Sequence, residues 1–104
     1  MPTPLNLRTT RRGDRTELVA AGEIDLSNVG EFKSAMDAAT AETRRGAVPL
    51  VVDLAEVEYV DSAAINVLSA GADEIHKLIV HPLLMTTFTV SGLTELIAIE
   101  AASA

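Results

Sequence analysis

The 104-residue sequence contains no cysteine, and aromatic residues make up only 3% of it. The absence of cysteine excludes disulfides and thiolate metal sites, and it is consistent with a reducing compartment. Because aromatic residues are so scarce, the core of a fold has to be built from Leu, Val, Ile and Ala. The hydrophobic fraction of 48% and the mean hydropathy of +0.27 are too high for a disordered chain.

Long apolar runs are also missing. The first six residues carry neither a basic stretch nor an apolar run of signal-peptide length. No apolar stretch approaches the roughly 20 residues that a membrane-spanning helix needs. We therefore expect a soluble, cytoplasmic protein without direct membrane insertion. The length predicts a single domain over residues 1–104, with frayed ends at 1–4 and 101–104.

Positive charge is in short supply. The chain has 8 Lys and Arg against 15 Asp and Glu, which gives a net charge of −7. Four of the basic residues lie close to the N-terminus, at Arg8, Arg11, Arg12 and Arg15. No basic face remains to bind a phosphate backbone, so we expect no nucleic acid partner. A basic protein partner is compatible with this charge.

Motifs for catalysis and cofactor binding are absent from the sequence. It has neither of the glycine-rich nucleotide-binding patterns. His76 and His81 lack a second ligand at zinc spacing, so we interpret them as surface residues that flank a strand. Asp25 and Asp61 could meet at one sheet edge, and paired carboxylates can transfer protons or bind a metal. No His, Lys or Cys accompanies Ser62 as an activating group. We expect no enzyme activity, no cofactor and no metal.

The first half of the chain predicts a hairpin and a helix. Alternating apolar residues over 5–9 and 16–20 predict two strands joined at Arg12–Asp14, the second ending at Gly22. A loop over 23–28 then leads into an amphipathic helix from Val29, whose apolar residues fall on one stripe.

Both ends of this helix carry typical signals. Asn28 and Glu31 are spaced as a capping box, which predicts the N-terminus. Gly46 can adopt the left-handed conformation that ends a helix. Arg44 and Arg45 suit the negative end of the helix dipole.

The second half predicts strands alternating with helices. Leu50–Val52 shows no alternation, which predicts a central parallel strand with helices on both faces. A short acidic loop follows, and then a helix that starts at Ser62 and ends at Gly71 or His76. Residues 78–80 read as a strand and 83–90 as a helix after Pro82, and residues 96–99 as a last strand or helical turn. The fold class is therefore α/β, with a mixed sheet of about four to five strands and three to four helices.

Asp61 and Ser62 stand at the end of the acidic loop that connects the apolar strand at Leu50–Val52 to the following helix. A serine at such a position is exposed and lies beside free backbone N–H groups, which suits an interaction or a phosphoryl group. Asp and Ser are also the residues preferred as helix N-caps, so a purely structural role is the alternative.

Three motifs carry a resemblance to a known family. They are Gly22-Glu23-Ile24-Asp25, the segment 53–65 (DLAEVEYVDSAAI) and Val90-Ser91-Gly92-Leu93. In this order they resemble the bacterial anti-sigma factor antagonists, which have the STAS fold and the patterns G-E-[LI]-D, D-L-x-x-V-x-[FY]-[MVI]-D-S-[ST]-G-[LIV] and [LM]-[TS]-G-L. Two residues of the second motif depart from its pattern: Ala63 replaces Ser or Thr, and Ala64 replaces Gly.

The resemblance implies a phospho-regulated binding module. Ser62 would be phosphorylated by an anti-sigma factor, a serine kinase that supplies ATP and Mg²⁺. The unphosphorylated form would bind that kinase and so release a sigma factor. The resemblance places the partner surface at Asp25, Ser27, Asn28, Asp61, Ser62, Ala63, Ala64 and Ile65.

Other functions of the same fold remain open. One is the small STAS subunit of a membrane lipid ABC transporter, which docks on an ATPase without phosphorylation. Another is a scaffold of the stressosome type. A weak homodimer is left open as well.

Overall fold

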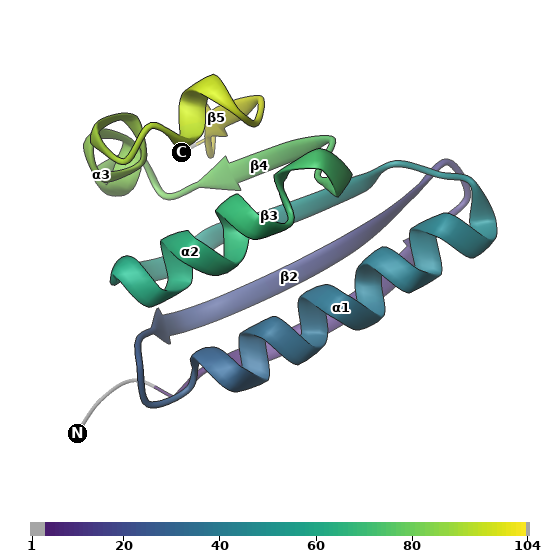
Figure 1. Cartoon of the computed structure of the whole chain (residues 1–104), viewed down its shortest axis with the longest axis horizontal. Coiled ribbons are helices and arrows are strands. Elements are labelled where there is room, and N and C mark those ends of the chain that lie inside the picture. Colours follow the sequence, from purple (N-terminus) through teal and green to yellow (C-terminus); the bar gives the residue numbers. More distant parts are fainter. Residues whose placement is uncertain (1–3, 104) are drawn as a thin grey trace.

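The sheet organises the chain, and the computed structural model describes residues 4–103 of it (Figure 1). Five strands lie in the order β1-β2-β3-β4-β5, with β1 antiparallel to β2 and the other neighbours parallel. The predicted mixed sheet is thus confirmed. The strands are β1 (Asn6–Arg12), β2 (Arg15–Ile24), β3 (Leu50–Val60), β4 (Lys77–Val80) and β5 (Ile99–Ala101).

Three α-helices connect the strands in this part of the chain. They are α1 (Val29–Gly46), α2 (Ser62–Ala70) and α3 (Met85–Val90). Single turns of 3₁₀ helix accompany them, namely η1 (Ala72–Glu74), η2 (Pro82–Leu84) and η3 (Leu93–Glu95). Within residues 4–103, no helix is both long and apolar enough to cross a bilayer.

The predicted hairpin is confirmed, but β2 is longer than predicted. Arg12 pairs with Arg15 across the turn. β2 continues two residues beyond Gly22, because Glu23 and Ile24 pair with β3. The loop before α1 therefore starts at Asp25 and not at Glu23.

β3 differs most from the prediction. The acidic segment after Val52 is not a loop, since β3 continues to Val60. Beyond Val52, the buried residues of β3 are Leu54, Val57 and Val60, which are three positions apart. This spacing arises because the register between β2 and β3 shifts twice, as at β-bulges. A bulged strand has no period of two, so the sequence pattern did not reveal it.

One face of the sheet forms the core. α1 and α2 lie in front of the sheet (Figure 1). Every second residue of β2 from Thr16 to Ile24 is buried. The expectation that helices cover both faces of β3 is wrong for Val51. This residue lies outside the core cluster, between Glu17 and Lys77 of the neighbouring strands. It is nevertheless only 7% exposed.

The ends of the elements bring smaller corrections. Ala47, with φ of 53°, takes the left-handed conformation after α1, and not Gly46. At Gly46 a Cβ would lie 2.5 Å from Nη1 of Arg11, so a larger residue there would displace the end of that flexible side chain. α2 ends before Gly71. Of the ends predicted as frayed, Ala101 is the last residue of β5, while residues 1–3 and 104 lie outside the described residues.

Candidate functional site

Two neighbouring loops meet at the carboxyl end of the sheet. Ile24 pairs with Val60, so the residues that follow, Asp25 and Asp61, begin adjacent loops. The N–H of Asp61 donates to the carbonyl of Ile24 at 3.2 Å, and the N–H of Leu26 donates to Oδ2 of Asp61 at 2.9 Å. We call residues 25–28 and 61–65 the strand-exit edge. Hydrogen bonds between the loops hold its two halves together.

Asp61 is the N-cap of α2. Its Oδ1 accepts hydrogen bonds from the N–H groups of Ala63 and Ala64, at 3.0 and 3.2 Å. With Oδ2 bound to Leu26, one carboxylate both caps the helix and ties the neighbouring loop to it. Ser62 is the first residue of α2 and is exposed. The capping role that the sequence left open therefore belongs to Asp61, and Ser62 has no part in it.

The loop before α1 is braced by its own side chains. The hydroxyl and the N–H of Ser27 both donate to Oδ1 of Asp25. These hydrogen bonds, that of the hydroxyl above all, hold the pKa of the Asp25 carboxyl below its ordinary value. Asp25 is thus a negative charge held in a fixed position at the strand-exit edge.

Asn28 closes this loop and does not cap the helix with its side chain. Its Oδ1 accepts from the N–H of Asp25, and its Nδ2 donates to the carbonyl of Glu23, both at 2.9 Å. The predicted capping box is wrong, because Asn28 makes no side-chain hydrogen bond to α1. Its amide can both donate and accept, and it spans the loop from Glu23 to Asp25 instead.

Not every residue predicted at the partner surface faces outward. Ala64 is fully buried and belongs to the hydrophobic core, while Ala63 and Ile65 are half-buried. A methyl group at residue 64 therefore packs inside the domain. Leu26, by contrast, is 78% exposed beside the acidic loop. Leu26 was not among the residues predicted at the partner surface, although a leucine that stands between Asp25 and Ser27 and belongs to no apolar stripe indicates such a position.

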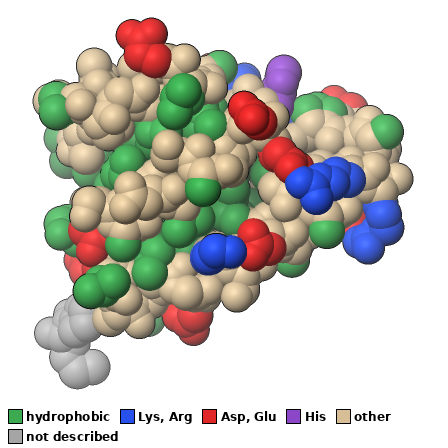
Figure 2. Space-filling view, in the orientation of Figure 1, with side chains coloured by type: hydrophobic (Ala, Val, Ile, Leu, Met, Phe, Trp, Pro, Cys, Tyr) green, Lys and Arg blue, Asp and Glu red, His purple; other side chains and the backbone are tan. Residues whose placement is uncertain are grey.

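A hollow of about 470 Å³ adjoins Ser62 between α2 and α3. Figure 2 shows hydrophobic side chains along the furrow between these helices. We call this hollow the α2–α3 groove. Its lining consists of Val60, Asp61, Ser62, Ile65, Asn66, Thr86, Thr87, Val90 and Ser91.

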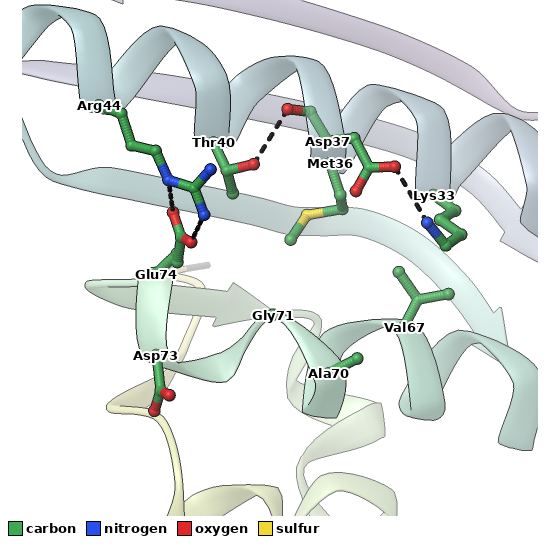
Figure 3. A pocket seen from close by; sticks show the side chains of 10 residues that line it. All are labelled: Lys33, Met36, Asp37, Thr40, Arg44, Val67, Ala70, Gly71, Asp73 and Glu74. Carbon is green, nitrogen blue, oxygen red and sulfur yellow. Dashed lines mark hydrogen bonds and ion pairs between the residues drawn. The ribbon is translucent and has the colours of Figure 1, made fainter.

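A second hollow, of about 290 Å³, lies between α1 and the α2–η1 segment (Figure 3). Its charged side chains bind mainly one another. Arg44 is paired with Glu74, and Lys33 with Asp37 at 3.0 Å. Ion pairs within the chain thus occupy the groups that could have bound a ligand, so this hollow is the weaker candidate.

Side chains that could bind a metal are not gathered anywhere in the described chain. Residues 4–103 contain no group of three or more His, Asp or Glu arranged to hold a cation. The Nδ1 of His81 accepts the N–H of Leu83 at 3.0 Å, which caps η2.

Charge is divided unevenly over the molecule. Among residues 4–103, seven of the eight Lys and Arg side chains form ion pairs, Arg8 being the exception. The acids around the strand-exit edge form no ion pair in this described region. They are Glu23, Asp25, Glu31, Glu58 and Asp61.

Comparisons with known proteins agree with this architecture. A family model described as "Mlab, STAS domain" matches residues 7–98. An anti-sigma factor antagonist from Mycobacterium paratuberculosis superposes with a TM-score of 0.82 at 19% identity, covering 95% of this chain and 87% of that one. Unphosphorylated SpoIIAA, an anti-sigma factor antagonist, gives 0.68 at 18% identity, covering 96% and 89%. Phosphorylated Bacillus SpoIIAA superposes with a TM-score of 0.60 at 18% identity, covering 96% of this chain and 92% of that one. A search of curated protein sequences gave no match. Identities this low show a shared fold alone.

Proposed function

Because this chain belongs to the STAS domain family, we propose that it is an anti-sigma factor antagonist switched by phosphorylation of Ser62. In this proposal the unphosphorylated chain sequesters a kinase-type anti-sigma factor in the cytoplasm, which frees a sigma factor. The kinase, with its own ATP and Mg²⁺, phosphorylates Ser62 and is released. The chain itself is the substrate and the binding partner, and it carries out no catalysis.

The position of Ser62 supports the proposal most directly. Ser62 is exposed at the start of α2, while Asp61 caps the helix. The hydroxyl is therefore accessible to a kinase and takes no part in the cap. The start of a helix also tolerates a phosphate well, because the backbone N–H groups and the helix dipole favour negative charge there.

The hydrogen bonds of Asp61 supply a physical route from phosphate to surface. A phosphate on Ser62 adds about −1.5 to −2 charges and three acceptor oxygens next to Asp61. It would compete with Asp61 for the N–H groups of Ala63 and Ala64 and repel its carboxylate. Since that carboxylate also holds Leu26, a displaced Asp61 loosens the loop over 25–28. One modification thus changes both halves of the strand-exit edge.

The test is phosphorylation by a purified kinase-type anti-sigma factor encoded beside this gene. We expect one phosphate per chain by mass spectrometry, and none on the Ser62→Ala variant. Ser69→Ala is the matched control, because Ser69 is also an exposed serine of α2 and its loss should change nothing. Phosphate on Ser27, Ser34 or Ser69 with Ser62 unmodified would refute the assignment.

A second candidate is a STAS subunit that docks on a transporter ATPase without phosphorylation. The apolar α2–α3 groove and the exposed Leu26 favour it, since neither feature needs a phosphate to bind a partner. If the chain copurifies with an ATPase, and the Ser62→Ala variant copurifies with it equally well, this function is favoured over the first.

A further inference from the structure

The α2–α3 groove lies between the two helices and beside the end of β3. α3 packs on the 3₁₀ turns η2 and η3 that flank it. Ser62, Ile65 and Asn66 form one wall, since positions i, i+3 and i+4 share a helix face. Thr86, Thr87 and Val90 form the other wall, and Val60 lies between them at the end of β3.

The groove is apolar although it lies at the surface. Val90 is 82% exposed on its wall, and Ile65 is half-buried opposite. A single exposed apolar residue is ordinary, but here two apolar side chains line the same hollow of about 470 Å³, and apolar surface gathered in a hollow is typical of sites where partners bind.

The rim of the groove is acidic. Asp61 lines it, Asp25 lies in the loop whose Leu26 N–H is bound by Asp61, and Glu58 lies near the end of β3. No Lys or Arg lines the groove, and no ion pair within residues 4–103 neutralises these three acids. A complementary surface therefore carries apolar side chains in its centre and Lys or Arg at its border.

We propose that the α2–α3 groove receives the apolar face of a helix of the protein partner, whose flanking Lys and Arg side chains meet the acidic rim. An amphipathic helix presents anchors at i, i+3 or i+4 and i+7, which suits a groove between two helices. The inference rests on the proposed function, because both place the partner at the strand-exit edge. It adds which part of the partner binds there, and how.

The inference also gives phosphorylation a second effect. Ser62 lies on the groove wall, so a phosphate there puts a doubly charged group beside the apolar anchors. An anchor that enters must then strip water from the phosphate, which is unfavourable even when the partner is basic. The cost of removing water from the phosphate therefore weakens binding of the partner in the groove, although the positive charge of the partner attracts the phosphate.

Two stapled helical peptides test the inference without a kinase or ATP. Both carry Leu at i, i+4 and i+7, and the other positions are Lys in one and Glu in the other. Titrated into the full chain, the Lys peptide should shift the backbone amide signals of Ile65, Asn66, Thr87 and Val90. The Glu peptide should bind at least tenfold more weakly.

Variants with matched controls locate the site. Val90→Glu should weaken the Lys peptide at least tenfold, whereas Leu83→Glu should not, although Leu83 is 84% exposed nearby in the sequence. Ser62→Asp should also weaken it, despite the added negative charge. Four results would each overturn the inference. The Lys peptide could bind Ser62→Asp more tightly, or both peptides could bind equally well. Leu83→Glu could have the same effect as Val90→Glu, or the Lys peptide could fail to bind up to about 1 mM. Phosphorylation of Ser62 is measured separately, so either result can fail alone.

Discussion

The two ends of the sheet treat charge in opposite ways. Where the strands start, Arg12 and Arg15 both bind Glu17, at 2.8 and 2.9 Å. The hydrogen bonds from Arg12 and then Arg15 hold the pKa of the Glu17 carboxyl below its ordinary value. Where the strands end, Asp25 and Asp61 receive hydrogen bonds from the backbone and from a hydroxyl, and neither forms an ion pair with any residue between 4 and 103.

The difference separates folding from recognition. At the start of the strands, opposite charges neutralise each other within the chain, and little net charge is left for a partner. At the strand-exit edge, N–H and O–H donors fix the positions of the acids without cancelling their charge. Figure 2 shows Lys and Arg side chains toward the right, where α1 ends, and none at the left, where β2 ends. Lys or Arg side chains of a partner can therefore form new ion pairs only at the strand-exit edge.

The largest expected effect comes from disrupting the strand that joins the two ends. Leu54→Asp places a charge in the core, where Leu54 is fully buried, and should cost about 4 kcal/mol or more. Val51→Asp should cost clearly less, because its carboxylate lies on the face without α1 and α2 and beside Lys77. Urea unfolding of both variants measures the difference. An equal loss would mean that the face of Val51 is as closed as the core.

Asp61→Ala should have the next largest effect and should damage the strand-exit edge selectively. It removes the cap of α2 and leaves the N–H of Leu26 without its acceptor. A lost cap costs about 1 kcal/mol, and the lost hydrogen bond adds about 1 kcal/mol. We expect a stability loss of about 2 kcal/mol in urea unfolding. Asp61→Asn keeps an acceptor and is the control, so an equal loss for Asn would argue against capping as the cause.

The sequence predicted those features that depend on local pattern. Alternation found the hairpin, and the helical stripe found α1. The step from apolar strand to Asp-Ser found the start of α2. All three depend on neighbours a few residues apart, which periodicity reports directly.

Features that depend on distant partners escaped prediction. β3 continues past Asp53 because β2 pairs with it through two register shifts, which no local period records. Asn28 looks like a cap until the carbonyl of Glu23 is seen beside its amide. The groove escaped prediction because Ile65 and Val90 meet only after β4 has placed α3 beyond α2.

The opposite end of the sheet should respond to pH. The pKa of Glu17 is lowered in the folded state, so its ion pairs stabilise the fold above the ordinary carboxyl pKa of 4.5. This contribution shrinks as the pH falls below 4.5 and is lost below the folded-state pKa. Glu17→Gln should therefore lose about 1 kcal/mol at pH 7, and the difference from the unmodified chain should vanish in acid. Thermal unfolding at several pH values measures it, and a gap that widens in acid would contradict the assignment.

The smallest expected effect on stability is at Ser62, where the expected effect on function is largest. Ser62→Ala removes a hydroxyl that does not cap α2 and introduces the best helix former. The free energy of unfolding should therefore change by less than about 0.5 kcal/mol, in the range of ordinary surface substitutions. Urea unfolding beside Asp61→Ala gives the comparison within one loop. A loss of 1 kcal/mol or more would mean that the hydroxyl supports the helix, and any lost phosphorylation would then have a structural explanation. If Ser62→Ala keeps its stability and incorporates no phosphate, Ser62 serves as the phosphorylation site, while its neighbour Asp61 stabilises the fold.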